Sequence, residues 1–125
     1  MNKEYLVRMS DAELENYAKA IGIKIPKDIK SKADFIEKRR ERTAKIEVLG
    51  ITFEIPIKRI KDKRVTDLIS NMNDVNAEKA LCLVLGEEQY AKLEEACIEE
   101  DGTYDVQAMG YAFTTIFTSP KLKNF

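Results

Sequence analysis

Residues 45–56 read KIEVLGITFEIP, and this segment determines the predicted fold class. Apolar side chains alternate with polar or charged ones on both sides of Leu49-Gly50, which is the pattern of a half-buried β-strand. A two-residue turn at Leu49-Gly50 predicts a hairpin that pairs Val48 with Ile51 and Ile46 with Phe53. All the apolar side chains then lie on one face, and Pro56 ends the second strand. Because an isolated hairpin is marginally stable, this face must pack on helices.

Four helices are predicted after the hairpin, since apolar residues recur there every three or four positions. Gly86 closes the second of them, Asp101-Gly102 closes the third, and Asp105 caps the fourth. The residues from Lys121 onward are expected to fray. The four apolar stripes are Val65, Leu68, Ile69 and Met72; Ala77, Leu81, Val84 and Leu85; Tyr90, Leu93, Ala96 and Cys97; and Val106, Met109, Ala112, Phe113, Ile116 and Phe117.

The chain before the hairpin carries two helix-start signals, Ser10-Asp11-Ala12-Glu13 and Ser31-Lys32-Ala33-Asp34. In such a pattern the Ser side chain accepts from a free backbone N–H at the helix start. Gly22 supplies a left-handed residue that closes the first helix. We therefore predict an α+β fold, mostly α. Residues 1–43 form a helix-extension-helix hairpin, and residues 44–125 form a β-hairpin followed by a bundle of about four helices.

The composition of the 125 residues is that of a globular chain, with 44% hydrophobic and 34% charged residues. Histidine, the commonest general base and metal ligand, is absent. Two cysteines cannot supply the four ligands of a structural zinc site, and no two of the glycines cluster into a phosphate-binding loop. We therefore expect no metal and no cofactor, and we predict that the protein is not an enzyme.

Cys82 and Cys97 occupy apolar positions of the predicted helices, so we expect buried, inert thiols. The carboxylates at positions 94–101 lack the spacing of a calcium loop, and a solvated helix face is the favoured interpretation. The longest apolar run, residues 80–85, is far shorter than the ~20 residues of a membrane span. The chain also begins without an apolar signal core, so we expect a cytoplasmic protein without membrane contact.

Charge is divided unequally along the chain. Residues 1–64 carry 17 Lys and Arg against 11 Asp and Glu, whereas residues 65–125 carry 4 against 11. This asymmetry suggests two units with different partners. Candidate phosphate-contacting residues in the basic half are Lys27, Lys30, Lys32, Lys38, Arg39 and Arg40. Acidic residues interrupt this set, so a solvated charged face is the favoured interpretation. The aromatic last stripe is expected in the core, with a partner groove as the alternative. Candidate partner-contacting residues outside this stripe are Tyr104, Tyr111 and Phe125.

Two segments of the second half carry a family resemblance. They are LGEEQYAKL, residues 85–93, and EEDGTYDVQAM, residues 99–109. Together with the hairpin before them and the aromatic helix after them, they resemble the tail assembly chaperones of long-tailed bacteriophages and prophages over residues 44–125. The resemblance implies a transient chaperone in the cytoplasm of a bacterial host. It would bind the tape-measure protein, keep it soluble while tail tube subunits assemble, and leave before the virion matures. The tail tube protein and a second copy of the chain are further candidate partners.

The first 42 residues are similar to SAP, HeH and LEM-like modules, which bind nucleic acid or proteins. The alternative hypothesis is therefore a small nucleic-acid-binding phage protein that acts through its basic N-terminal hairpin. Salt-dependent DNA retention that is lost when Lys38, Arg39 and Arg40 become Glu would favour it. A third hypothesis, a structural neck or tail component, predicts that the protein stays in purified virions, which a chaperone would leave.

Overall fold

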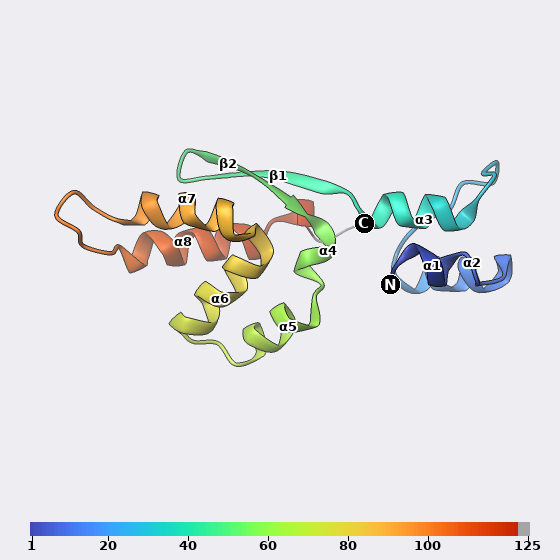
Figure 1. The fold of residues 1–125 in the computed structure, drawn as a ribbon, viewed down its shortest axis with the longest axis horizontal. Coiled ribbons are helices and arrows are strands. Elements are labelled where there is room, and N and C mark those ends of the chain that lie inside the picture. The colour runs from blue at the N-terminus through green and yellow to red at the C-terminus, as the bar shows by residue number, and fades with distance from the viewer. Residues whose placement is uncertain (123–125) are drawn as a thin grey trace. The chain divides into compact units, whose positions relative to one another are not determined.

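The computed structural model describes residues 1–122 and has an α+β fold, mostly helical with one antiparallel two-stranded hairpin (Figure 1). The predicted fold class is confirmed. The described chain divides into two compact units, Met1–Arg42 and residues 43–122. Phe125, which we expect to contact a partner, lies outside the described residues.

The first unit contains three helices, α1 (Lys3–Leu6), α2 (Asp11–Ala20) and α3 (Lys32–Arg40). The two predicted caps are present: the Ser10 side chain accepts from the backbone N–H of Glu13, and the Ser31 side chain accepts from that of Asp34. Gly22 has φ +80°, which is the left-handed conformation expected of a glycine that ends a helix. The core of this unit consists of Leu6, Leu14, Ala18, Ile23, Ala33 and Ile36.

Helix α1 was not predicted, because four residues are too few to show a helical period. Its Leu6 is nevertheless only 1% exposed, and α1 packs against α3. The first unit is therefore more than a two-helix hairpin, since an extra helix covers part of its core.

The second unit begins with β1 (Thr43–Val48) and β2 (Ile51–Pro56), which pair in the predicted register. Leu49 and Gly50 both have positive φ, at +53° and +73°, as a tight hairpin turn of this kind requires. Five apolar side chains of the hairpin are buried on one face, and Ile51 is half-buried beside them. The hairpin prediction is confirmed in register, turn and buried face.

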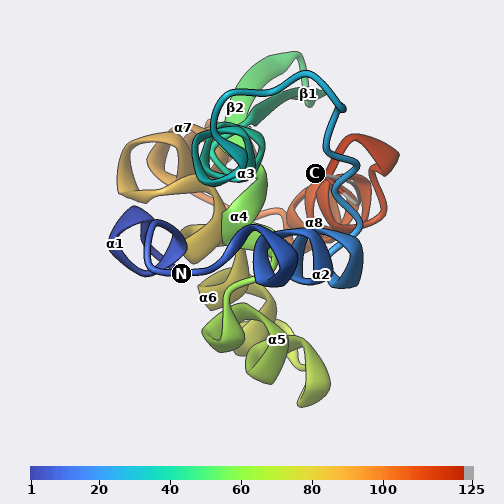
Figure 2. The ribbon, with the colours of Figure 1, turned by 90° about the vertical axis from the view of Figure 1, so that its right-hand side faces the viewer.

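Helices α4 (Ile57–Ile60), α5 (Lys63–Ser70), α6 (Asp74–Leu85), α7 (Glu87–Cys97) and α8 (Val106–Phe117) follow, and the 3-10 turn η1 (Pro120–Leu122) comes after them. Helices α7 and α8 lie antiparallel, joined by the loop at the left of Figure 1, with the hairpin running alongside. Figure 2 shows α5 and α6 side by side below the hairpin. The short helix α4 was not predicted.

The core of the second unit lies between the hairpin and the helices, and among the described residues every buried side chain is hydrophobic. Several expectations about it were wrong. Ile69, Met72, Ala96 and Val106 belong to the predicted apolar stripes but are exposed, because each of these stripes turns only partly inward. Leu122 was expected to fray, but it is 2% exposed and η1 packs against β1. The rest of the expected frayed tail lies outside the described residues.

The side chain of Gln89, at the start of α7, binds the outer edge of β2. Its Oε1 accepts from the Glu54 N–H at 2.8 Å, and its Nε2 donates to the Glu54 carbonyl at 2.9 Å. Nε2 also donates to the Leu85 carbonyl at 2.8 Å. The Gln89 amide thus makes the two hydrogen bonds that a neighbouring strand would make to Glu54, and it joins the LGEEQY segment to the hairpin.

We expect Gln89→Leu to lower the free energy of unfolding by about 1 kcal/mol, because two backbone groups of Glu54 lose their partner. Urea unfolding followed by circular dichroism measures this loss. Gln107→Leu, at an exposed position of α8, is the control and should leave stability within about 0.5 kcal/mol of the wild type. Equal stability of the two variants would show that the amide bridge contributes nothing.

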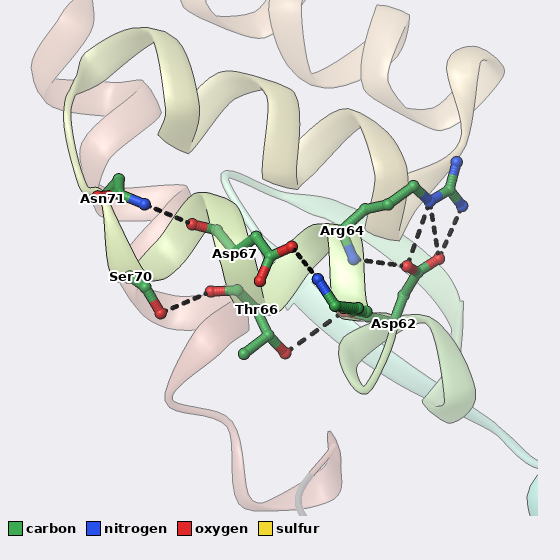
Figure 3. A network of polar contacts seen from close by, with 7 residues as sticks. Asp62, Arg64, Thr66, Asp67, Ser70 and Asn71 are labelled. Atoms are coloured by element: carbon green, nitrogen blue, oxygen red, sulfur yellow. Dashed lines mark hydrogen bonds and ion pairs between the residues drawn. The ribbon is translucent and has the colours of Figure 1, made fainter.

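The outer face of α5 is held by a local polar network (Figure 3). The Asp62 carboxylate accepts from the backbone N–H and the guanidinium of Arg64, and Lys63 pairs with Asp67 at 2.7 Å. Ser70 and Asn71 donate to carbonyls one turn earlier. These bonds orient a helix of eight residues while its Val65 packs inward.

The hydrogen bond from the Arg64 side chain, followed by that from its backbone N–H, lowers the pKa of Asp62 below its ordinary value of 3.8. A lowered folded-state pKa stabilises the fold above pH 3.8, and this contribution is lost as the pH falls through the folded-state pKa. We expect the melting temperature of the wild type to fall more steeply below pH 3.8 than that of Asp62→Asn, which keeps a capping side chain but does not titrate. Identical pH profiles of the melting temperature would contradict this assignment.

Candidate functional site

A groove between α6 and α8 is the candidate site. Each helix contributes one periodic face: positions 74, 77, 78 and 81 of α6, and positions 106, 109, 110, 113 and 114 of α8. Met72 and Asn73, in the turn before α6, also line the groove, which has a volume of about 260 Å³. The spacing i, i+3, i+4, i+7 explains the alignment, because it places successive side chains on one side of a helix.

The walls of the groove are mainly apolar, and part of this surface is open to solvent. Val106 is 64% exposed and Met72 is 49% exposed, although both are large hydrophobic residues. Ile69 and Val75 are exposed as well, but they do not line the groove. Exposed apolar surface gathered around a groove is typical of a protein-contact site.

Tyr104 fixes one wall of the groove. Its hydroxyl donates to Glu78 Oε1 at 3.1 Å across a sequence separation of 26 residues. Burial raises the pKa of Tyr104, and the hydrogen bond to the Glu78 carboxylate raises it further. The phenol therefore stays protonated at neutral pH and remains a donor, so that Glu78 is held in place on α6.

Gly110 leaves the middle of the α8 wall without a side chain. A Cβ built at this position meets no atom within 4 Å. Glycine costs roughly 0.5–1 kcal/mol relative to alanine inside a helix. The space at Gly110 therefore belongs to the groove and not to the packed core.

Two of the predicted partner-contacting residues, Tyr104 and Tyr111, lie among the described residues and have different positions. Tyr104 is half-buried and supports the groove through Glu78, as described above. Tyr111 is 60% exposed on α8 but does not line the groove. The sequence favoured the core over a partner groove for the α8 stripe, and it did not identify α6 as the second wall of a groove. The number of apolar residues on α8, between Val106 and Phe117, was the available signal. They are more than one side of a helix can turn toward the core, so some of them had to form a second apolar surface.

The predicted phosphate-contacting residues lie in the first unit, and several already have partners there. Lys32 pairs with Glu15, and the Arg40 guanidinium donates to the Met1 carbonyl at 2.6 Å. Lys27, Lys30 and Lys38 are exposed, whereas Arg39 is half-buried. At least two of the six cations, Lys32 and Arg40, are therefore already engaged by groups of the same unit.

Cys97 is buried, and burial raises the pKa of its thiol, whereas Cys82 is half-buried. Neither is in a disulfide. Within residues 1–122, no group of three or more His, Cys, Asp or Glu residues could hold a metal ion. In the same part of the chain, no helix combines the length and the apolar character needed to cross a membrane.

The groove is suited to binding apolar side chains, and its polar lining residues are Asn73, Asp74, Glu78 and Thr114. Its volume is slightly below the ~300–1,000 Å³ of typical small-molecule sites. An apolar cavity of about 150 Å³ holds one benzene-sized group, so this groove can accept one or two large side chains of a partner. Comparison of the chain with protein-family models, with curated proteins and with solved structures yields no match.

Proposed function

We propose that this protein is a phage tail assembly chaperone that holds an apolar helical segment of the tape-measure protein in the groove between α6 and α8. The observation that carries the proposal is the groove itself. Its two walls are the facing sides of α6 and α8, and exposed apolar residues lie at its rim. The resemblance of residues 85–109 to tail assembly chaperones names the partner. Gln89 and Tyr104, two residues of the matching segments, hold the hairpin and the groove wall.

The physical basis is burial of apolar surface. A long tape-measure chain exposes apolar helical stripes before the tube forms around it, and these stripes aggregate unless they are covered. A partner helix whose apolar residues recur at i, i+3, i+4 and i+7 fits a groove of this kind. Each apolar side chain that is transferred from water into the groove gains roughly 1.5–3 kcal/mol when fully buried.

Co-expression tests the proposal. The tape-measure protein encoded in the same genome is produced alone and together with this protein, and its soluble fraction is measured after centrifugation. We expect the soluble fraction to rise only on co-expression, and we expect the two proteins to co-purify. An unchanged soluble fraction with no co-purification would refute the proposed function.

A further inference from the structure

We infer that the groove selects a helix whose apolar stripe is bordered by Lys or Arg residues, an inference that rests on the proposed function and names the chemistry of the bound segment. Among the described residues that line the groove, Asp74 and Glu78 are acidic and none is Lys or Arg. These two carboxylates are one helical turn apart on α6, so both border the same side of the groove.

The position of each carboxylate is set by the fold. Asp74 is the first residue of α6 and is exposed beside the groove entrance. Glu78 is held by the Tyr104 hydroxyl, which leaves its second carboxylate oxygen available to a further donor. A Lys or Arg on a docked helix can therefore pair with either carboxylate while the apolar stripe enters the groove.

The dipoles of the neighbouring helices do not cancel the negative charge that Asp74 and Glu78 bring to the groove. Helices α6 and α8 both begin at the groove, and each N-terminus contributes about half a positive charge. Asp74 and Asp105, at these two helix starts, carry a full negative charge each, and Glu78 adds a third. The surrounding sequence acts in the same direction, because residues 65–125 carry 11 acidic and only 4 basic residues. The summed field near the groove is thus negative and repels an acidic helix.

Two synthetic amphipathic helices test the inference with the full chain. Both have about 18 residues, or five turns, with one Leu/Ala stripe, and the flanking positions are Lys in one peptide and Glu in the other. We expect the Lys peptide to bind at least about tenfold more tightly in ~0.1 M NaCl, measured by fluorescence anisotropy. In ~1 M NaCl the difference should shrink, because salt screens the charges.

A matched pair of variants locates the effect. Asp74→Lys should remove most of the preference for the Lys peptide. Glu88→Lys should keep the preference, since it makes the same charge change in the first turn of α7 but does not line the groove. Both substitutions place a cation near a helix N-terminus, so their effects on stability are comparable.

Three outcomes would overturn the inference. Equal affinity for both peptides would show a groove without charge selection, which leaves the proposed chaperone function standing. Binding of neither peptide, with tape-measure rescue still observed on co-expression, would place the partner elsewhere on the protein. A homodimer in sedimentation equilibrium that Gly110→Phe dissociates would show that a second copy of this chain occupies the groove. Failure of the proposed function is detected separately, by co-expression.

Discussion

Phe53→Ala is expected to lower the free energy of unfolding of the second unit by about 3–5 kcal/mol. Phe53 is fully buried on the inner face of the hairpin, where it pairs with Ile46. Its removal leaves a cavity between the hairpin and the helices that the surrounding side chains fill only in part. A loss of this size is a large fraction of the roughly 5–15 kcal/mol that stabilises an ordinary domain.

Urea unfolding followed by amide NMR measures this loss, because the resonances of residues 43–122 report on the second unit. Thr52→Ala is the matched control, since Thr52 is next to Phe53 but points away from the core and is exposed. It should change stability by no more than about 0.5 kcal/mol. A loss below about 1 kcal/mol for Phe53→Ala would show that the hairpin is not part of the core that we describe.

Strong local signals made the hairpin and the capped helices predictable. Alternation over residues 45–56 determines the buried face without help from the rest of the chain, because a slip of one residue would expose every apolar side chain. The caps at Ser10 and Ser31 are equally local, since each needs only a side-chain oxygen three residues before a free N–H. The structure therefore confirms both predictions.

The short helices and the groove were not predictable, and the reasons differ. Helices α1 and α4 have four residues each, and a single turn shows no period. The groove depends on how α6 and α8 pack against each other. The apolar residues of a single helix do not determine that packing. Val106 and Met109 are three residues apart and belong to one stripe, yet Val106 is 64% exposed and Met109 is 4% exposed.

Gly110→Phe should abolish partner binding while the fold stays intact. The position is helical and a Cβ there meets no atom within 4 Å, so a larger side chain can enter the groove without displacing the core. Replacement of a helical glycine also removes its entropic cost of roughly 0.5–1 kcal/mol. The phenyl ring would occupy the space that we assign to the partner. We expect affinity for the Lys-flanked peptide to fall by more than about tenfold, and tape-measure rescue to be lost.

Gln107→Phe separates groove blocking from a general effect of an added aromatic side chain. Gln107 lies on the same helix, is exposed and does not line the groove. This variant should bind the peptide and rescue the tape-measure protein as well as the wild type does. If Gly110→Phe, shown to be folded by circular dichroism, still binds with wild-type affinity, the partner does not enter the groove. The exposed apolar residues at its rim would then need another explanation, because folding alone gives no reason to leave Val106 and Met72 in water.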